Sequence, residues 1–80
     1  MKARIYVTLR KGVLDPQGKA IQRSLSHLGM AGVDEVRVGK FMEVTLAEMS
    51  RPEAEKLLDE ACRRLLANTV IEDYRFEIEG

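Results

Sequence analysis

The sequence predicts an α+β fold: a two-layer sandwich in which an antiparallel sheet carries both helices on one face. Three segments alternate apolar and polar residues, which is the period of half-buried strands. Two further segments repeat apolar residues every three or four positions, which is the period of amphipathic helices. The resulting order is β-α-β-β-α-β, and a length of 80 residues predicts a single domain, residues 1–80.

The first strand and the first helix follow each other closely. The strand is predicted from the alternating apolar residues Ala3, Ile5, Val7 and Leu9. Asp15 and Pro16 then predict a helix start, because the aspartate can accept from free N–H groups and proline lacks one. The helix should run from about 16 to 28 and end in a left-handed glycine cap at Gly29. Its apolar face consists of Ile21, Leu25 and Leu28.

The segment from Val33 to Ala47 is predicted to be a long strand kinked near Gly39. Its apolar residues keep the same parity across Gly39, namely Val36, Val38, Met42, Val44 and Leu46. A two-residue turn at Gly39 and Lys40 would break that parity, whereas a kink or a bulge preserves it. A bent single strand and a bulged hairpin both remain open.

The second helix and the last strand complete the chain. Ser50 and Glu53 form a capping-box pattern, and the apolar face that follows consists of Ala54, Leu57, Leu58, Ala61, Cys62, Leu65 and Leu66. The last strand is predicted from Val70, Tyr74, Phe76 and Ile78, which should share one face. The acidic side chains of Glu72, Asp73, Glu77 and Glu79 are expected to be solvated and to bind no metal.

Composition excludes several classes of function. Thirteen Lys and Arg balance thirteen Asp and Glu, which argues against a nucleic-acid binder with a basic footprint. Residues 1–40 hold eight cations and three anions, and residues 41–80 hold five cations and ten anions. That split favours complementary docking, in copies of the chain or in a larger assembly, unless interleaved strands cancel it. We find no apolar stretch long enough for a membrane span and no signal peptide, and we expect a cytoplasmic protein.

A chain of this length has a small core, so association is expected to add stability. The single Cys62 excludes an internal disulfide, and Cys62 with the only histidine, His27, is too few for a metal site. Cys62 is expected to be a buried hydrophobe. His27 is expected to complement the dipole at the end of the first helix. No nucleophile, base and orienting group stand in a recognisable motif.

The junction from Arg10 to Ala20 is the main candidate site. Its glycines are six positions apart and Lys19 is followed by alanine, so it does not match a phosphate-binding loop. We therefore interpret it as a docking loop for another protein, with a contribution from the region of Gly39. The predicted partner surface consists of Arg10, Lys11, Gly12, Asp15, Pro16, Gly18, Lys19, Arg37, Gly39 and Lys40. A purely structural role is at least as good an interpretation for Asp15, Pro16 and Gly39.

Three segments carry a resemblance to a known family. Residues 7–20 read VTLRKGVLDPQGKA, residues 32–44 read GVDEVRVGKFMEV and residues 65–74 read LLANTVIEDY. In this order they resemble PurS, the small subunit of phosphoribosylformylglycinamidine (FGAM) synthase, across nearly the whole chain. Thr69, where proline is expected in many members, is the one departure.

The resemblance implies a role in purine biosynthesis without an active site on this chain. In the family's complex, a glutamine-hydrolysing ligase (EC 6.3.5.3), the PurQ glutaminase releases ammonia. The PurL synthetase uses ATP and magnesium to convert formylglycinamide ribonucleotide to formylglycinamidine ribonucleotide. PurS bridges the two, supports ammonia transfer, binds no cofactor itself and forms a homodimer or homotetramer. The alternative is a small ligand-binding or acylphosphatase-like domain of similar fold.

Overall fold

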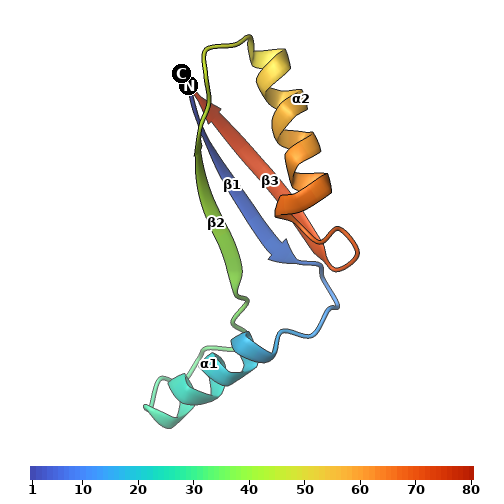
Figure 1. The fold of residues 1–80 in the computed structure, drawn as a ribbon. Helices are drawn as coiled ribbons and strands as arrows, with labels where there is room; N and C mark the ends of the chain where they lie inside the picture. The colour runs from blue at the N-terminus through green and yellow to red at the C-terminus, as the bar shows by residue number, and fades with distance from the viewer.

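The computed structural model describes residues 1–80 and shows three strands and two helices (Figure 1). The strands are β1 (Lys2–Leu9), β2 (Gly39–Thr45) and β3 (Glu72–Glu79). They form one antiparallel sheet in the order β2-β1-β3. Helix α1 spans Pro16–His27, and helix α2 spans Arg51–Ala61 and continues into a π-helical turn, Cys62–Leu66. The predicted α+β class with an antiparallel sheet is confirmed.

The core lies on one face of the sheet, and strand register determines its members. Ile5 of the central strand pairs with Met42 on one side and with Phe76 on the other, so directly opposed residues place their side chains on the same face. The fully buried residues of this face and of the helix above it are Ala3, Ile5, Val7, Ala54, Leu58 and Cys62. The buried state predicted for Cys62 is confirmed, and burial raises the pKa of its thiol.

Helix α2 covers this core, and its first turn is capped as the sequence predicts. The Ser50 hydroxyl accepts a hydrogen bond from the Glu53 N–H at 3.2 Å. Ion pairs at i,i+4 join Asp59 to Arg63 at 2.9 Å and Glu60 to Arg64 at 3.1 Å. One side of α2 faces the outer edge of the sheet, because the Tyr74 hydroxyl of edge strand β3 donates to Asp59 at 2.6 Å.

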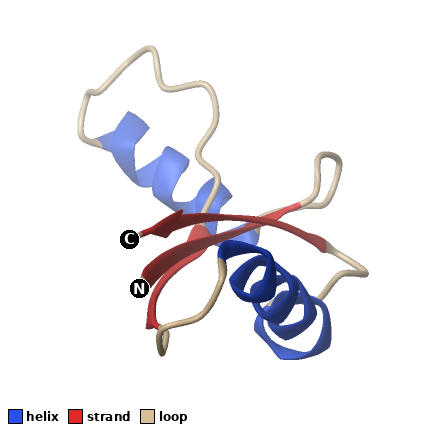
Figure 2. Ribbon diagram, turned by 90° about the horizontal axis from the view of Figure 1, so that it is seen from above, coloured by secondary structure: helices blue, strands red, loops and turns tan.

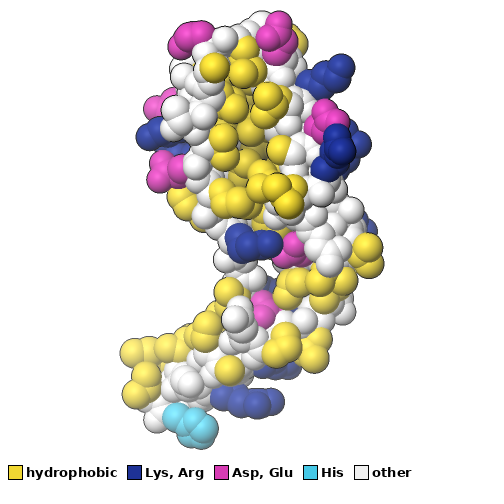
Figure 3. Space-filling view, in the orientation of Figure 1, with side chains coloured by type: hydrophobic (Ala, Val, Ile, Leu, Met, Phe, Trp, Pro, Cys, Tyr) yellow, Lys and Arg dark blue, Asp and Glu magenta, His cyan; other side chains and the backbone are white.

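The other side of α2 leaves part of the sheet face uncovered. Residues Leu57 and Asp59 lie about 200° apart around the helix axis, so Leu57 points toward the β2 side. Leu57 and Ala61 of α2, together with Met42 and Val44 of β2, line a half-buried to exposed apolar strip. Figure 3 shows this apolar surface between β2 and α2. We call these four residues the apolar strip.

Helix α1 does not pack on the sheet. It lies beyond the end of the strands, on a projection formed by residues 10–38 (Figures 1 and 2). We call residues 10–38 the arm and the rest of the chain the body. The predicted placement of both helices on one face is therefore wrong for the single chain. Periodicity defines an apolar side of α1, but periodicity carries no information about which surface that side contacts, and in the single chain Ile21 and Leu28 are exposed.

The predicted long strand is paired only over its second part. Strand β2 begins at Gly39 itself, and residues 33–38 make no backbone–backbone hydrogen bonds. Gly39 is needed where the strand starts, because a Cβ at this position would lie 2.6 Å from the carbonyl oxygen of Val7. The predicted kink is thus the point where the chain leaves the arm and enters the sheet.

The arm makes the molecule elongated. Its principal extents are 49 × 26 × 15 Å and its radius of gyration is 16.2 Å, whereas a compact domain of this length has a radius of gyration of about 12 Å. The accessible surface is 5954 Å², against about 4,900 Å² for a typical compact protein of this mass. The single chain therefore exposes about 1,000 Å² more than a compact fold would.

Candidate functional site

Asp15 is the centre of the predicted site, and its carboxylate accepts two hydrogen bonds from the backbone. Its Oδ1 accepts from the Gly18 N–H at 2.9 Å, which caps α1, and its Oδ2 accepts from the Val38 N–H at 2.7 Å. The side chain is buried, and the donated bonds from Val38 and then Gly18 lower its pKa. Asp15 therefore holds the beginning and the end of the arm together.

Two arginines of the predicted site brace the same region. Arg37 donates to the carbonyl oxygens of Val13 at 2.9 Å and Arg10 at 3.1 Å. The Arg10 guanidinium donates to the Thr69 carbonyl and lies 3.5 Å from Asp73. The bonds of Arg37 join the two ends of the arm, and the contacts of Arg10 tie the arm to the body, so both arginines have structural roles that the sequence did not reveal.

The glycines of the site are required by the backbone. A Cβ at Gly18 would lie 1.9 Å from the carbonyl oxygen of Val36, so only glycine allows α1 to approach the returning chain this closely. Gly12 has a φ of +90°, which favours glycine in the turn that enters the arm. Pro16 occupies the first position of α1, where its missing N–H costs nothing.

Ion pairs within the molecule compensate much of the charge difference between the two halves of the chain. Four ion pairs join a cationic side chain of the first half to an anion of the second: Lys2 with Glu43, Arg4 with Glu79, Arg10 with Asp73 and Lys40 with Glu72. The interleaved strands bring these halves together, as the sequence allowed. Lys11 and Lys19 make no ion pair or side-chain hydrogen bond, so these two cations of the predicted site remain available to a partner.

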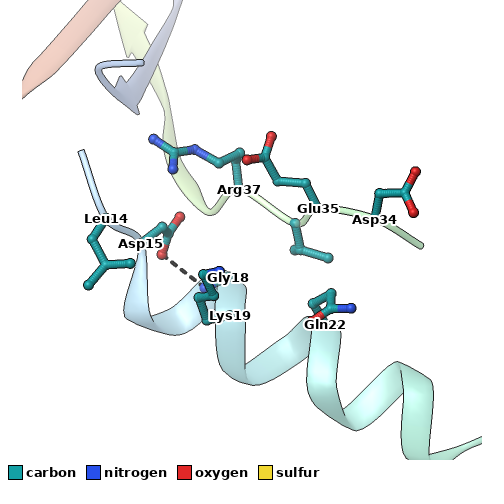
Figure 4. A pocket seen from close by; sticks show the side chains of 9 residues that line it. Leu14, Asp15, Gly18, Lys19, Gln22, Asp34, Glu35 and Arg37 are labelled. Carbon is teal, nitrogen blue, oxygen red and sulfur yellow. Dashed lines mark hydrogen bonds between the residues drawn. The ribbon is translucent and has the colours of Figure 1, made fainter. Parts of the chain in front are cut away.

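A small hollow lies between α1 and the returning segment of the arm (Figure 4). Its volume is about 100 Å³, and Lys19, Gln22, Asp34 and Glu35 are among its lining residues. The pocket is too small for a typical small-molecule ligand, which needs several hundred Å³. No group of three or more His, Cys, Asp or Glu side chains in the structure could hold a metal ion.

The sheet face opposite α2 carries an aromatic cluster. Tyr6 and Phe41 have ring centroids 5.2 Å apart, and the Arg75 guanidinium lies 3.9 Å over the Tyr6 ring. Phe41 is 54% exposed, which is high for a large apolar side chain. The alternation of β1 placed Tyr6 on this face, but only the strand register brings Phe41 and Arg75 beside it. Aromatic and arginine side chains of this kind are enriched at protein interfaces.

The described features define a class of protein: a small α+β domain whose projecting helix, uncovered apolar strip and open sheet face are suited to contact with other chains. The comparisons with known proteins identify the family within that class. The family model PurS, described as phosphoribosylformylglycinamidine (FGAM) synthase, matches residues 2–80. The chain belongs to the PurS family.

Individual relatives agree with this assignment. The PurS subunit of Synechocystis sp. is 56% identical over 94% of this chain and 75% of its own length. The PurS subunit of Bacillus subtilis is 49% identical over 98% of this chain and 92% of its own. A crystal form of B. subtilis PurS is 48% identical and superposes with a TM-score of 0.90 over 99% of this chain and 98% of its own.

A structure of PurLQS from Thermotoga maritima is also similar, with a TM-score of 0.86, 32% identity, and coverage of 95% of this chain and 93% of that one. The acylphosphatase-like alternative gains no support from these matches. No helix is long and apolar enough to cross a membrane.

Proposed function

We propose that this chain is the non-catalytic subunit of FGAM synthase that bridges the PurQ glutaminase and the PurL synthetase and supports the transfer of ammonia between them. The observation that carries the proposal is similarity over 95% of the chain to a chain in the PurLQS structure from T. maritima. In this proposal ATP and magnesium are used by the synthetase, and the complex is a cytoplasmic ligase of purine biosynthesis.

The partner surface we propose is the entrance to the arm. Lys11 and Lys19 are exposed and unpaired, while the bonds of Asp15 and Arg37 fix the backbone that presents them. A rigid backbone reduces the entropy that docking must overcome, and free cations favour an acidic partner surface. Arg10, Gly12, Pro16, Gly18, Gly39 and Lys40 contribute to this surface by shaping it.

Self-association is the second part of the proposal, as a homodimer or a homotetramer. The apolar side of α1 is exposed, with Ile21 at 43% and Leu28 at 72%. Exposed apolar surface of this extent is unfavourable in an isolated chain. The additional exposed area of about 1,000 Å² is comparable to the roughly 800 Å² that each partner buries in a standard interface.

Reconstitution tests the bridging role. Purified PurL and PurQ, mixed with and without this chain, should co-sediment as one complex only when the chain is present. Lys11→Glu and Lys19→Glu in one chain should weaken that complex. Lys56→Glu is a matched control, because Lys56 is an exposed, unpaired lysine on α2. A complex that forms equally well without the chain would contradict the bridging role.

A further inference from the structure

Three basic side chains form a row along one side of α1. Lys19, Arg23 and His27 are spaced four residues apart, so they lie one above the other on successive turns of the helix. All three are exposed, and α1 contains no Asp or Glu. We call Lys19, Arg23 and His27 the basic row. From end to end the row is about 12 Å long.

The basic row faces neither the apolar side of α1 nor the returning segment of the arm. Arg23 and Leu25 are about 200° apart around the helix axis, so the row lies opposite the apolar side. Figure 3 shows apolar side chains along one edge of the arm, and basic side chains with the histidine along the other. The returning segment contacts a third side of α1, at Gly18 and Gln22. The row therefore stays accessible even when another chain covers the apolar side.

No anion of the chain compensates the basic row. Its three side chains make no ion pair and no side-chain hydrogen bond. Asp34 and Glu35 line the hollow beside Lys19 but do not pair with it. Like charges four residues apart, such as Lys19 and Arg23, destabilise a helix. An anionic surface opposite the row would remove that repulsion.

Two small side chains lie beside the basic row. Ala20 and Ser24 are exposed and precede Arg23 and His27 by three residues, so they are neighbours on the helix surface. Small side chains let a second helix approach closely. A helix with Asp or Glu at four-residue spacing repeats its charges at the same interval as the row. The row and its small neighbours therefore fit an acidic helix.

A second copy of this chain does not offer such a helix. Two basic rows would repel each other. The acidic residues of α2 and its extension are largely paired within the same chain: Glu55 with Arg51, Asp59 with Arg63 and Glu60 with Arg64. Nucleic acid also fits less well than a protein, because the formal net charge of the chain is zero.

We propose that the basic row is a docking surface for an acidic helix of another subunit in the FGAM synthase complex. The inference rests on the bridging role proposed above and specifies the chemistry of the contact. It extends the partner surface from the entrance of the arm to the outer side of α1, and it adds Arg23 and His27.

Photocrosslinking tests the contact directly, because Cys62 is the only cysteine and is buried. Arg23→Cys introduces an exposed thiol that benzophenone maleimide labels, and the labelled chain is then mixed with purified PurL and PurQ. We expect light to join it to one of these subunits, at a helix rich in Asp and Glu that mass spectrometry identifies. Lys56→Cys, at an exposed lysine of α2, is the matched control and should give at least tenfold less product.

Charge reversal provides the second measurement. Arg23→Glu and His27→Glu in one chain should weaken assembly with PurL and PurQ at least tenfold, whereas Arg23→Lys and His27→Lys should leave it unchanged. Circular dichroism should show that both variants are folded.

Three outcomes would overturn the proposal. If the complex forms, but position 23 gives no crosslink and charge reversal has no effect, docking through the basic row is wrong and the bridging role stands. If charge reversal abolishes binding of the chain to an RNA oligonucleotide and leaves assembly unchanged, the row binds nucleic acid instead. If the unaltered chain forms no complex with PurL and PurQ, the bridging role and this proposal are both wrong.

Discussion

The carboxylate of Asp15 joins the two ends of the arm, because Oδ2 accepts from the Val38 N–H at 2.7 Å while Oδ1 accepts from the Gly18 N–H at 2.9 Å. One buried side chain thus starts α1 and fixes the segment that returns from it to the sheet. The direction of the arm depends on this residue, and so does any surface that the arm presents.

Asp15→Ala is expected to lower the melting temperature more than Ser50→Ala does. Each residue caps a helix, but Asp15 also satisfies the N–H of Val38. Loss of the Ser50 cap should reduce the free energy of unfolding by about 1 kcal/mol. Thermal unfolding of both variants under the same conditions measures the difference, and equal melting temperatures would contradict the joining role of Asp15.

The contribution of Asp15 should depend on pH. Its pKa is lowered in the folded state, from 3.8, by the bonds from Val38 and Gly18. Its stabilisation is therefore complete above the unfolded-state value and is lost as pH falls through the folded-state value. Denaturant unfolding of the unaltered protein and of Asp15→Asn should differ at neutral pH, and the difference should shrink in acid. If the difference in free energy of unfolding between the two proteins stays constant as pH falls through the folded-state pKa of Asp15, this mechanism is wrong.

Gly18→Ala should destabilise the protein, although alanine is the better helix former. In a free helix this change would gain up to about 1 kcal/mol. Here the new Cβ would lie 1.9 Å from the Val36 carbonyl oxygen, so the arm would have to open at a cost of about 1–3 kcal/mol. The exposed neighbour Gln17 provides the control, since Gln17→Ala should be neutral or stabilising. Chemical denaturation compares the two, and a stabilised Gly18→Ala protein would refute the close approach.

Tyr74→Phe should lower the melting temperature by a few degrees at neutral pH. It removes the 2.6 Å hydrogen bond to Asp59, which raises the pKa of Tyr74 and lowers that of Asp59. The difference from the unaltered protein should begin to shrink as pH falls below 3.8 and should be lost as pH falls through the lowered folded-state pKa of Asp59. It should likewise begin to shrink as pH rises above 10 and should be lost as pH rises through the raised folded-state pKa of Tyr74. Melting temperatures across this range check both limits, and a difference independent of pH would contradict them.

Lys11→Glu and Lys19→Glu together should weaken binding to the synthetase and glutaminase partners at least tenfold without changing the melting temperature. Neither lysine has a bonding partner within the chain, so no internal contact is lost. The effect should decrease as salt screens the charges. Binding measured at low and high ionic strength, with Lys56→Glu as the charge-matched control for Lys11→Glu and Lys19→Glu taken singly, distinguishes a docking surface from a general effect of net charge.

Local structure followed closely from the sequence. Periodicity and cap residues correctly predicted both helix N-caps, the left-handed cap at Gly29 and the alternating face of β1. Such features depend on residues within a few positions of each other.

The position of the arm could not be predicted in this way. Whether α1 packs on its own sheet depends on bonds between distant residues, such as Asp15 with Val38 and Arg37 with Arg10. The roles of Arg10 and Arg37 were missed for the same reason, because a guanidinium that binds backbone carbonyls has no sequence signature. The aromatic cluster at Tyr6 depends on strand register, which alternation within one strand does not determine.

The central claim is that this chain supports ammonia transfer between the active sites of other subunits. Formation of formylglycinamidine ribonucleotide by PurL and PurQ, measured with glutamine and separately with ammonium salt as the nitrogen source, tests it most directly. We expect the chain to be required when glutamine supplies the nitrogen and to matter much less when ammonia is added. Glutamine-dependent activity that is unchanged when the chain is omitted would contradict the claim.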